Sequence, residues 1–232
     1  MEFRLLGPLE VIEDDRSLAL GGGRQRSLLG ALLLHANEVV STDRLIHAVW
    51  GESPPPTATK SIQVYVSRLR NELGERRLVS CPLGYVLKID RSELDLGRFE
   101  QLLGEARTAD PPQAAQKLRR ALALLRGPAL ADLAYEPFVQ AGIARLEELR
   151  WAALEQRIDA DLASGRHAEV IGELEALVAK HPLRERPRCQ LMLALCRPAA
   201  PTVLVRRGPR PGGLAPPETA TRFGWSMTAN AL

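Results

Sequence analysis

The residues best suited to recognising another molecule lie between positions 57 and 73. On a helix turning by about 100° per residue, one narrow stripe is apolar, with Tyr65 beside it: Ile62, Val66, Leu69 and Leu73. The opposite face and its flanks carry cations, amides, a hydroxyl and one valine: Lys60, Gln63, Val64, Ser67, Arg68, Arg70 and Asn71. Such a face suits the DNA major groove, because Arg and Lys donate to guanine, Gln and Asn bond adenine, and Val meets a thymine methyl.

Further cations stand where phosphates would lie. Arg76, Arg77 and Lys88 bracket a predicted hairpin, which would approach the DNA backbone as a wing. Arg24 and Arg26 open a predicted helix, whose first backbone N–H groups favour an anion. An ordinary solvated helix face remains the alternative for residues 60–71, since Lys, Arg, Gln and Asn are common on any exposed helix.

Catalytic and metal chemistry find little support. Gly21-Gly22-Gly23-Arg24 lacks the Gly-Lys-Ser/Thr ending of a nucleotide loop and predicts a flexible turn. Asp159 and Asp161 point in different directions on one helix, and we expect both at the surface. Cys189 and Cys196 are expected in packing. With no nucleophile–base pair, we predict a non-enzyme without cofactor or metal.

The elements around residues 57–73 predict how this helix is held. Short apolar runs at 3–6, 9–12 and 18–20 predict a small antiparallel sheet, followed by a helix over 24–36. Ser41 caps a short helix that ends at Gly51, and Thr57 is expected to cap the helix that ends at Gly74. Runs at 77–81 and 85–89 around a Pro/Gly turn predict a hairpin. This is the parts list of a winged helix-turn-helix over residues 1–92.

The remainder divides into two parts. Residues 93–196 are helical throughout, with breaks at 109–112, 127–128, 136–137, 164–165 and 180–182, which predicts helical hairpins of the tetratricopeptide kind. Residues 197–232 are rich in Pro, Gly and Arg without any period, so we expect a disordered tail. The predicted fold class is therefore an α+β winged helix-turn-helix followed by an all-α domain.

Composition limits the class of protein. The 232 residues are 45% hydrophobic and 25% charged, as in ordinary globular chains. The net charge is +3, yet residues 1–93 carry equal numbers of basic and acidic side chains, so DNA binding depends on local placement. Three scattered cysteines predict a cytoplasmic protein, and the absence of a long apolar run predicts that a membrane is not a partner. Association with the nucleoid is expected from the predicted DNA binding.

Several motifs together resemble a known family. The runs at 40–46, 49–51, 66–70 and 84–87, with Pro56 and Leu73, are similar to the OmpR-type winged helix of the SARP-type regulators, the Streptomyces antibiotic regulatory proteins. The second half resembles their bacterial transcriptional activation domain in Asp95, Phe99 and Gly127 and in the runs at 121–124, 146–150, 165–168, 181–186 and 190–195. After Leu195 the sequence departs from the family, so the last hairpin is expected to expose an apolar face.

The resemblance implies a transcriptional activator of a secondary-metabolite gene cluster that carries a two-component-type effector domain. Such proteins bind direct repeats in double-stranded DNA side by side, and their helical half contacts a neighbouring copy and RNA polymerase, through its sigma or alpha subunit. By matching position, Lys60, Gln63, Val64, Ser67, Arg68 and Asn71 would face DNA, with Arg70 on the flank and Tyr85 near the wing. A protein-binding adaptor and a DNA-binding competitor without activation are the alternatives.

Overall fold

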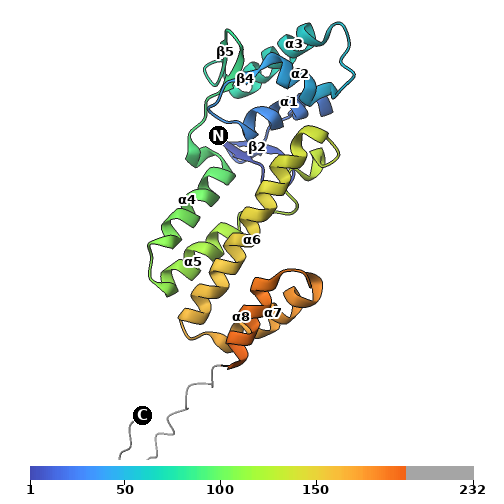
Figure 1. The fold of residues 1–232 in the computed structure, drawn as a ribbon. Coiled ribbons are helices and arrows are strands. Elements are labelled where there is room, and N and C mark those ends of the chain that lie inside the picture. The colour runs from blue at the N-terminus through green and yellow to red at the C-terminus, as the bar shows by residue number, and fades with distance from the viewer. Residues whose placement is uncertain (197–232) are drawn as a thin grey trace, which may run out of the picture. The chain divides into compact units, whose positions relative to one another are not determined.

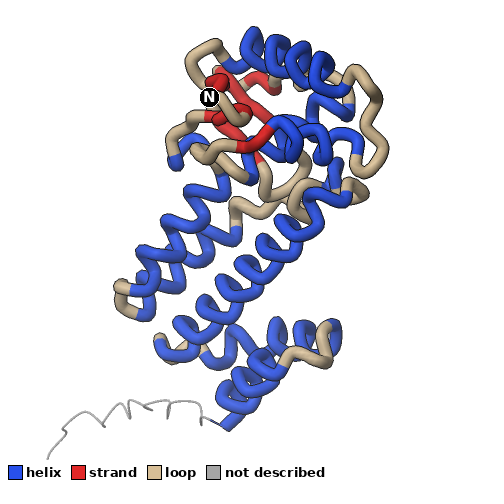
Figure 2. The backbone as a smooth tube through the Cα atoms, turned by 45° about the horizontal axis from the view of Figure 1, so that its top comes forward, coloured by secondary structure: helices blue, strands red, loops and turns tan. Residues whose placement is uncertain are grey.

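A computed structural model describes residues 1–196, and the predicted disorder of residues 197–232 lies outside the described residues. The fold begins as a small α+β region and continues as helices (Figures 1 and 2), which confirms the predicted fold class. None of the described helices is long and apolar enough to span a membrane. The elements are β1 (Glu2–Arg4), β2 (Glu10–Glu13), β3 (Arg16–Ser17), α1 (Gly23–Leu34), β4 (Val40–Ser41), α2 (Thr42–Trp50), α3 (Ala58–Leu73), β5 (Leu78–Cys81), β6 (Gly84–Leu87), η1 (Arg91–Glu93), α4 (Asp95–Arg107), α5 (Pro111–Leu122), η2 (Ala131–Leu133), η3 (Pro137–Val139), α6 (Gln140–Ala163), α7 (His167–Lys180) and α8 (Glu185–Cys196).

The first sheet is antiparallel in the order β1-β2-β3, as the sequence predicts. Its third strand lies at 16–17 rather than 18–20. Asp14 and Asp15 have φ of 47° and 61°, the left-handed conformations of a tight two-residue turn, so pairing resumes directly at Arg16.

The second sheet joins the predicted hairpin to a strand that the sequence did not indicate. β6 pairs with β5 and also with β4, whose two residues are too few to show a period. Gly84 makes this pairing possible, because a Cβ there would lie 2.0 Å from the Val40 carbonyl oxygen. The predicted Ser41 cap is confirmed by its 3.2 Å bond from the Arg44 amide, whereas the Thr57 side chain caps nothing.

Helices α4 to α8 begin and end close to the predicted breaks. The exception is the stretch 129–139, which is not a regular helix but loops through η2 and η3. This stretch packs against the winged-helix core, to which it contributes Leu130, Leu133 and Val139. Figure 1 shows α6 running from this contact toward α7 and α8, at the opposite end of the described chain from α3.

Asp95 joins the two halves. Its buried carboxylate accepts hydrogen bonds of 2.7–2.9 Å from the backbone N–H groups of Leu5, Leu6 and Leu96. Burial raises the pKa of Asp95, and these bonds oppose that shift. Asp132 makes a second junction by accepting from the Leu9 amide and the Arg26 guanidinium. The described residues 1–196 accordingly belong to one compact unit.

The helical half corrects two expectations about side chains. Asp161 is fully buried rather than at the surface, because Arg119, Arg157 and Arg166 surround its carboxylate at 2.6–3.2 Å. Cys189 and Cys196 are exposed rather than packed. The last hairpin does expose the expected apolar face, formed by Leu183, Met192, Leu193 and Leu195.

Candidate nucleic-acid interface

Helix α3 has the two faces that its sequence predicts. Ile62, Val66, Leu69 and Leu73 are buried against the rest of the winged helix, and Tyr65 is half-buried beside them. The opposite face is exposed along its length, over Lys60, Gln63, Val64, Ser67, Arg68 and Asn71. Val64 is 47% exposed, so no other part of the described chain covers this apolar side chain. This face of α3 is therefore free to enter the major groove of DNA.

The hairpin stands beside α3 and is held to it by Arg70. The Arg70 Nε donates to the Leu78 carbonyl oxygen at 2.8 Å, and its guanidinium also donates to the Ser80 hydroxyl at 2.7 Å. These bonds tie the helix to strand β5, and the DNA contact expected of Arg70 stays a prediction.

The wing is short and has an apolar tip. Cys81 pairs with Gly84, which leaves a two-residue turn of Pro82 and Leu83. Leu83 is 77% exposed, and it is not among the DNA-contacting residues that the sequence predicts. The sequence could have predicted this exposure, because Leu83 lies in the turn between two predicted strands, where an apolar side chain has no core to pack against.

Arg24 lies where the sequence places it, at the exposed start of α1. Its guanidinium carbon lies 5.7 Å from the centre of the Trp50 ring, and Trp50 in turn stacks on Tyr65 at 6.3 Å. This cation–π contact holds the guanidinium near the α2–α3 connection. The connection between Arg24 and α3 through two aromatic rings could not be read from the sequence.

Two other predicted phosphate contacts have carboxylate partners inside the protein. Arg26 pairs with Asp132 and donates to the Leu9 carbonyl oxygen at 2.7 Å, so its guanidinium is engaged within the protein. Arg77 donates to both carboxylate oxygens of Glu93, at 2.7 and 2.8 Å, and this guanidinium lowers the pKa of Glu93. Both side chains brace the winged helix.

Tyr85, expected near the wing, lies within it. It occupies β6 opposite Val40 and Ser80 and packs half-buried against the core. The structure thus places Tyr85 as support for the wing.

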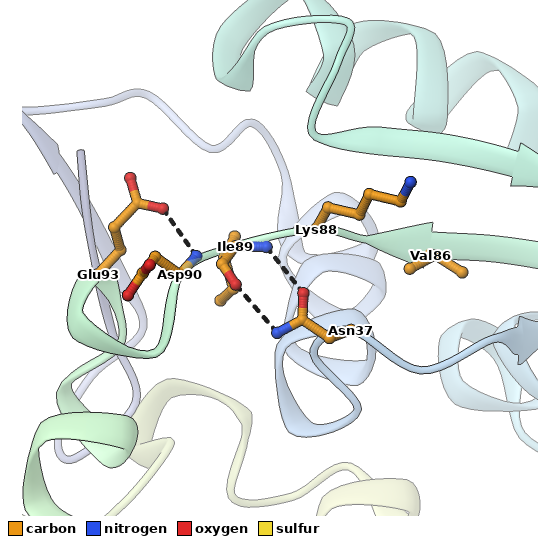
Figure 3. A pocket seen from close by; sticks show the side chains of 6 residues that line it. All are labelled: Asn37, Val86, Lys88, Ile89, Asp90 and Glu93. Carbon is orange, nitrogen blue, oxygen red and sulfur yellow. Dashed lines mark hydrogen bonds between the residues drawn. The ribbon is translucent and has the colours of Figure 1, made fainter. Parts of the chain in front are cut away.

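The end of β6 is anchored by Asn37, as Figure 3 shows. The Asn37 amide donates to the Ile89 carbonyl oxygen at 3.0 Å and accepts from the Ile89 N–H at 3.1 Å. These groups line a shallow open hollow together with Lys88, whose ammonium points away from both bonds (Figure 3). The hollow therefore belongs to the scaffold of the wing, and Lys88 stays at its exposed edge.

The remaining cations give the surface its charge. Lys60, Arg68 and Arg76 are exposed and have no ion pair with any residue of the described range 1–196. Glu72 and Glu75 are exposed nearby at the C-terminal end of α3, away from the centre of its outward face. The arrangement offers a polar helix flanked by unneutralised cations, which is what a phosphate backbone and a major groove require together.

Two family models match this chain. The one described as "Transcriptional regulatory protein, C terminal" covers residues 17–86, and the one described as "Bacterial transcriptional activator domain" covers residues 94–200. The first range contains α3 and the wing, and the second contains α4 to α8.

Known regulators align over both ranges. The regulatory protein AfsR of Streptomyces griseus is 43% identical over 201 residues, which are 85% of this chain and 20% of that protein. The regulatory protein DnrI of Streptomyces peucetius is 34% identical over 212 residues, which are 85% of this chain and 78% of that protein. The chain thus spans most of DnrI but only a fifth of AfsR.

A solved structure agrees in fold. Mycobacterium tuberculosis EmbR, in complex with a low-affinity phosphopeptide, superposes with a TM-score of 0.80 at 38% identity, over 83% of this chain and 54% of that one. The same two domains in the same order, and an alignment that covers most of DnrI, establish that this chain belongs to the SARP family of transcriptional regulators.

Proposed function

We propose that this protein is a sequence-specific DNA-binding activator of a secondary-metabolite gene cluster. The observation that carries the proposal is the exposed outward face of α3, on which cations, amides, a hydroxyl and Val64 lie without any covering element. We assign base contacts to Gln63, Val64, Ser67, Arg68 and Asn71, and phosphate contacts to Lys60, Arg24, Arg76 and Lys88. Arg70, Arg77, Arg26 and Tyr85 position these contacts.

In this proposal residues 1–92 bind DNA and residues 93–196 form the activation domain. Copies bind direct repeats side by side, and the helical half contacts RNA polymerase through its sigma or alpha subunit. A membrane has no part in this mechanism, and the protein acts in the cytoplasm on the chromosome. The support is the family membership together with the distance of α7 and α8 from α3, which leaves the helical end free when α3 lies on DNA (Figure 1).

The test begins with selection of binding sites from a pool of random double-stranded oligonucleotides. For the selected site, we expect Arg68→Ala to weaken binding at least tenfold at fixed salt and to relax preference at one base pair. Arg107→Ala is the matched control, because Arg107 is an exposed arginine on α4 without an ion-pair partner in residues 1–196. Failure to enrich any sequence, with no binding at low salt, would favour the adaptor function instead.

A second candidate is a DNA-binding competitor without activation. The exposed apolar side chains of the last hairpin favour it, because an activation domain that packs fully would cover them. Transcription in vitro from the selected site separates the two functions. Increased transcript supports the activator, whereas binding with reduced transcript supports the competitor.

A further inference from the structure

Two adjoining hollows of about 220 Å³ each lie where the winged helix meets the helical half. Both are lined by Leu34, His35, Arg44 and Phe138. The first extends toward α4 and α6, and the second extends toward α2 and β4. They are separate from the outward face of α3, which contributes no residue to either.

The walls of the hollows are mainly apolar. Leu96 of α4 and Leu146 of α6 line the first, and Ala31, Val40 and Ala48 line the second. Phe138 of η3 stands at both. A Cβ on Gly142 would lie 3.1 Å from the side chain of Leu34, so α6 approaches α1 closely along this seam. Side chains from both halves of the protein thus form one apolar surface.

The basic side chains at the rim have carboxylate neighbours, with one exception. Arg145 lies 3.4 Å from Glu100, His35 lies 3.4 Å from Glu38, and His47 lies 3.8 Å from Glu52. Arg44 borders both hollows, and within residues 1–196 its guanidinium has no carboxylate partner. An unneutralised guanidinium beside an apolar surface is complementary to an anionic head attached to an apolar body.

We propose that this seam is a binding site for a small organic acid with an aryl or alkyl body. The carboxylate pairs with Arg44, and the apolar body lies against Phe138, Leu34 and Leu146. One hollow alone is smaller than the roughly 300 Å³ at which ligand pockets begin, so the ligand occupies both. The occupant contacts α2 on one side and α6 on the other, and it stabilises the contact between the two halves.

Binding is measured by isothermal titration with 4-phenylbutyrate and octanoate, each compared with its uncharged amide. We expect saturable millimolar or tighter binding, with the acids about tenfold stronger than the amides. Arg44→Gln removes that preference. Ala141→Trp weakens acid and amide alike, because Ala141 is exposed and lines the first hollow, which the indole fills.

Two controls keep the result specific. Arg107→Gln removes an exposed arginine elsewhere and leaves binding unchanged. Met192→Gln tests the exposed apolar face of α8 as a competing site and also leaves it unchanged. Thermal melts verify that each variant folds. Any one of four results overturns the proposal. These are equal binding of the acid and its amide, a preference for the acid that survives Arg44→Gln, loss of binding in Met192→Gln, and no saturation by about 10 mM.

Discussion

At the scale of single residues, arginines in the same helix have different roles, depending on whether they have a partner within the protein. Arg68 and Arg70 are two positions apart on α3, yet Arg68 is free and exposed while Arg70 is bonded to β5. The sequence predicts the exposed face from its period. It does not predict which cations are neutralised, because Arg26 and Arg77 find carboxylates 106 and 16 positions away.

Replacement of Arg70 tests its role as a tie. In Arg70→Ala the strand β5 loses two hydrogen bonds, so we expect faster hydrogen exchange at the amides of Val79 and Val86 and DNA binding weakened about threefold to tenfold. Arg76→Ala is the contrasting variant. It should lower the salt dependence of DNA binding without changing exchange in the wing, and equal exchange in both variants would contradict the assignment.

The ion pair between Arg77 and Glu93 predicts a pH dependence. The guanidinium lowers the pKa of Glu93, so its contribution to stability is full above the ordinary carboxyl pKa and is lost as pH falls through the lower value in the folded state. We expect Glu93→Gln to reduce the free energy of unfolding by up to about 1 kcal/mol at pH 7. Urea denaturation should show this difference shrinking toward pH 3, whereas Glu175→Gln, at an exposed carboxylate, changes little at either pH.

At the scale of elements, the number of residues in a helix or strand decided whether the sequence could predict it. Helices α4 to α8 and the hairpin have enough residues to show a period and clear breaks, and the structure confirms them. β4 has two residues, and 129–139 owes its shape to contact with the winged-helix core. The sequence holds no local signal for either, because the stabilising contacts are made by residues far along the chain.

Gly84 is the element-scale test. An added Cβ would meet the Val40 carbonyl oxygen at 2.0 Å, so Gly84→Ala should separate β4 from β6 and reduce the free energy of unfolding by more than about 2 kcal/mol. Gly104→Ala is the matched control, since its Cβ meets nothing within 4 Å in the interior of α4. There the change should stabilise the protein by about 0.5 to 1 kcal/mol, and equal effects at the two sites would refute the contact.

At the scale of the whole molecule, the two halves share a core although their sequences differ in period. Leu94, Leu130, Leu133 and Val139 pack with residues of the winged helix, and Asp95 bonds the backbone at Leu5 and Leu6. The sequence supports a division near residue 92, but it cannot show that later residues complete the core of the first part. The packing in the structure shows that the core of the winged helix depends on these later residues.

A fragment ending at residue 92 should therefore be less stable than the same residues in the whole chain. It loses the apolar side chains of 130–139 and exposes their contacts on α1, at an expected cost of at least about 3 kcal/mol. Hydrogen exchange at the α1 amides 28–33 measures the difference. Equal protection in the fragment and the whole chain would show that the shared core contributes nothing.

The arginines around Asp161 have a consequence for how variants combine. Arg119, Arg157 and Arg166 come from α5, α6 and the turn before α7, and all three share one buried carboxylate. Loss of any one guanidinium leaves the carboxylate neutralised by the other two, so single replacements are buffered and their effects do not add. Loss of the carboxylate has less reserve, because Arg119 and Arg166 then have no carboxylate partner among the described residues and Arg157 keeps only Glu173. We therefore expect the junction to tolerate replacement of its arginines one at a time better than replacement of its aspartate.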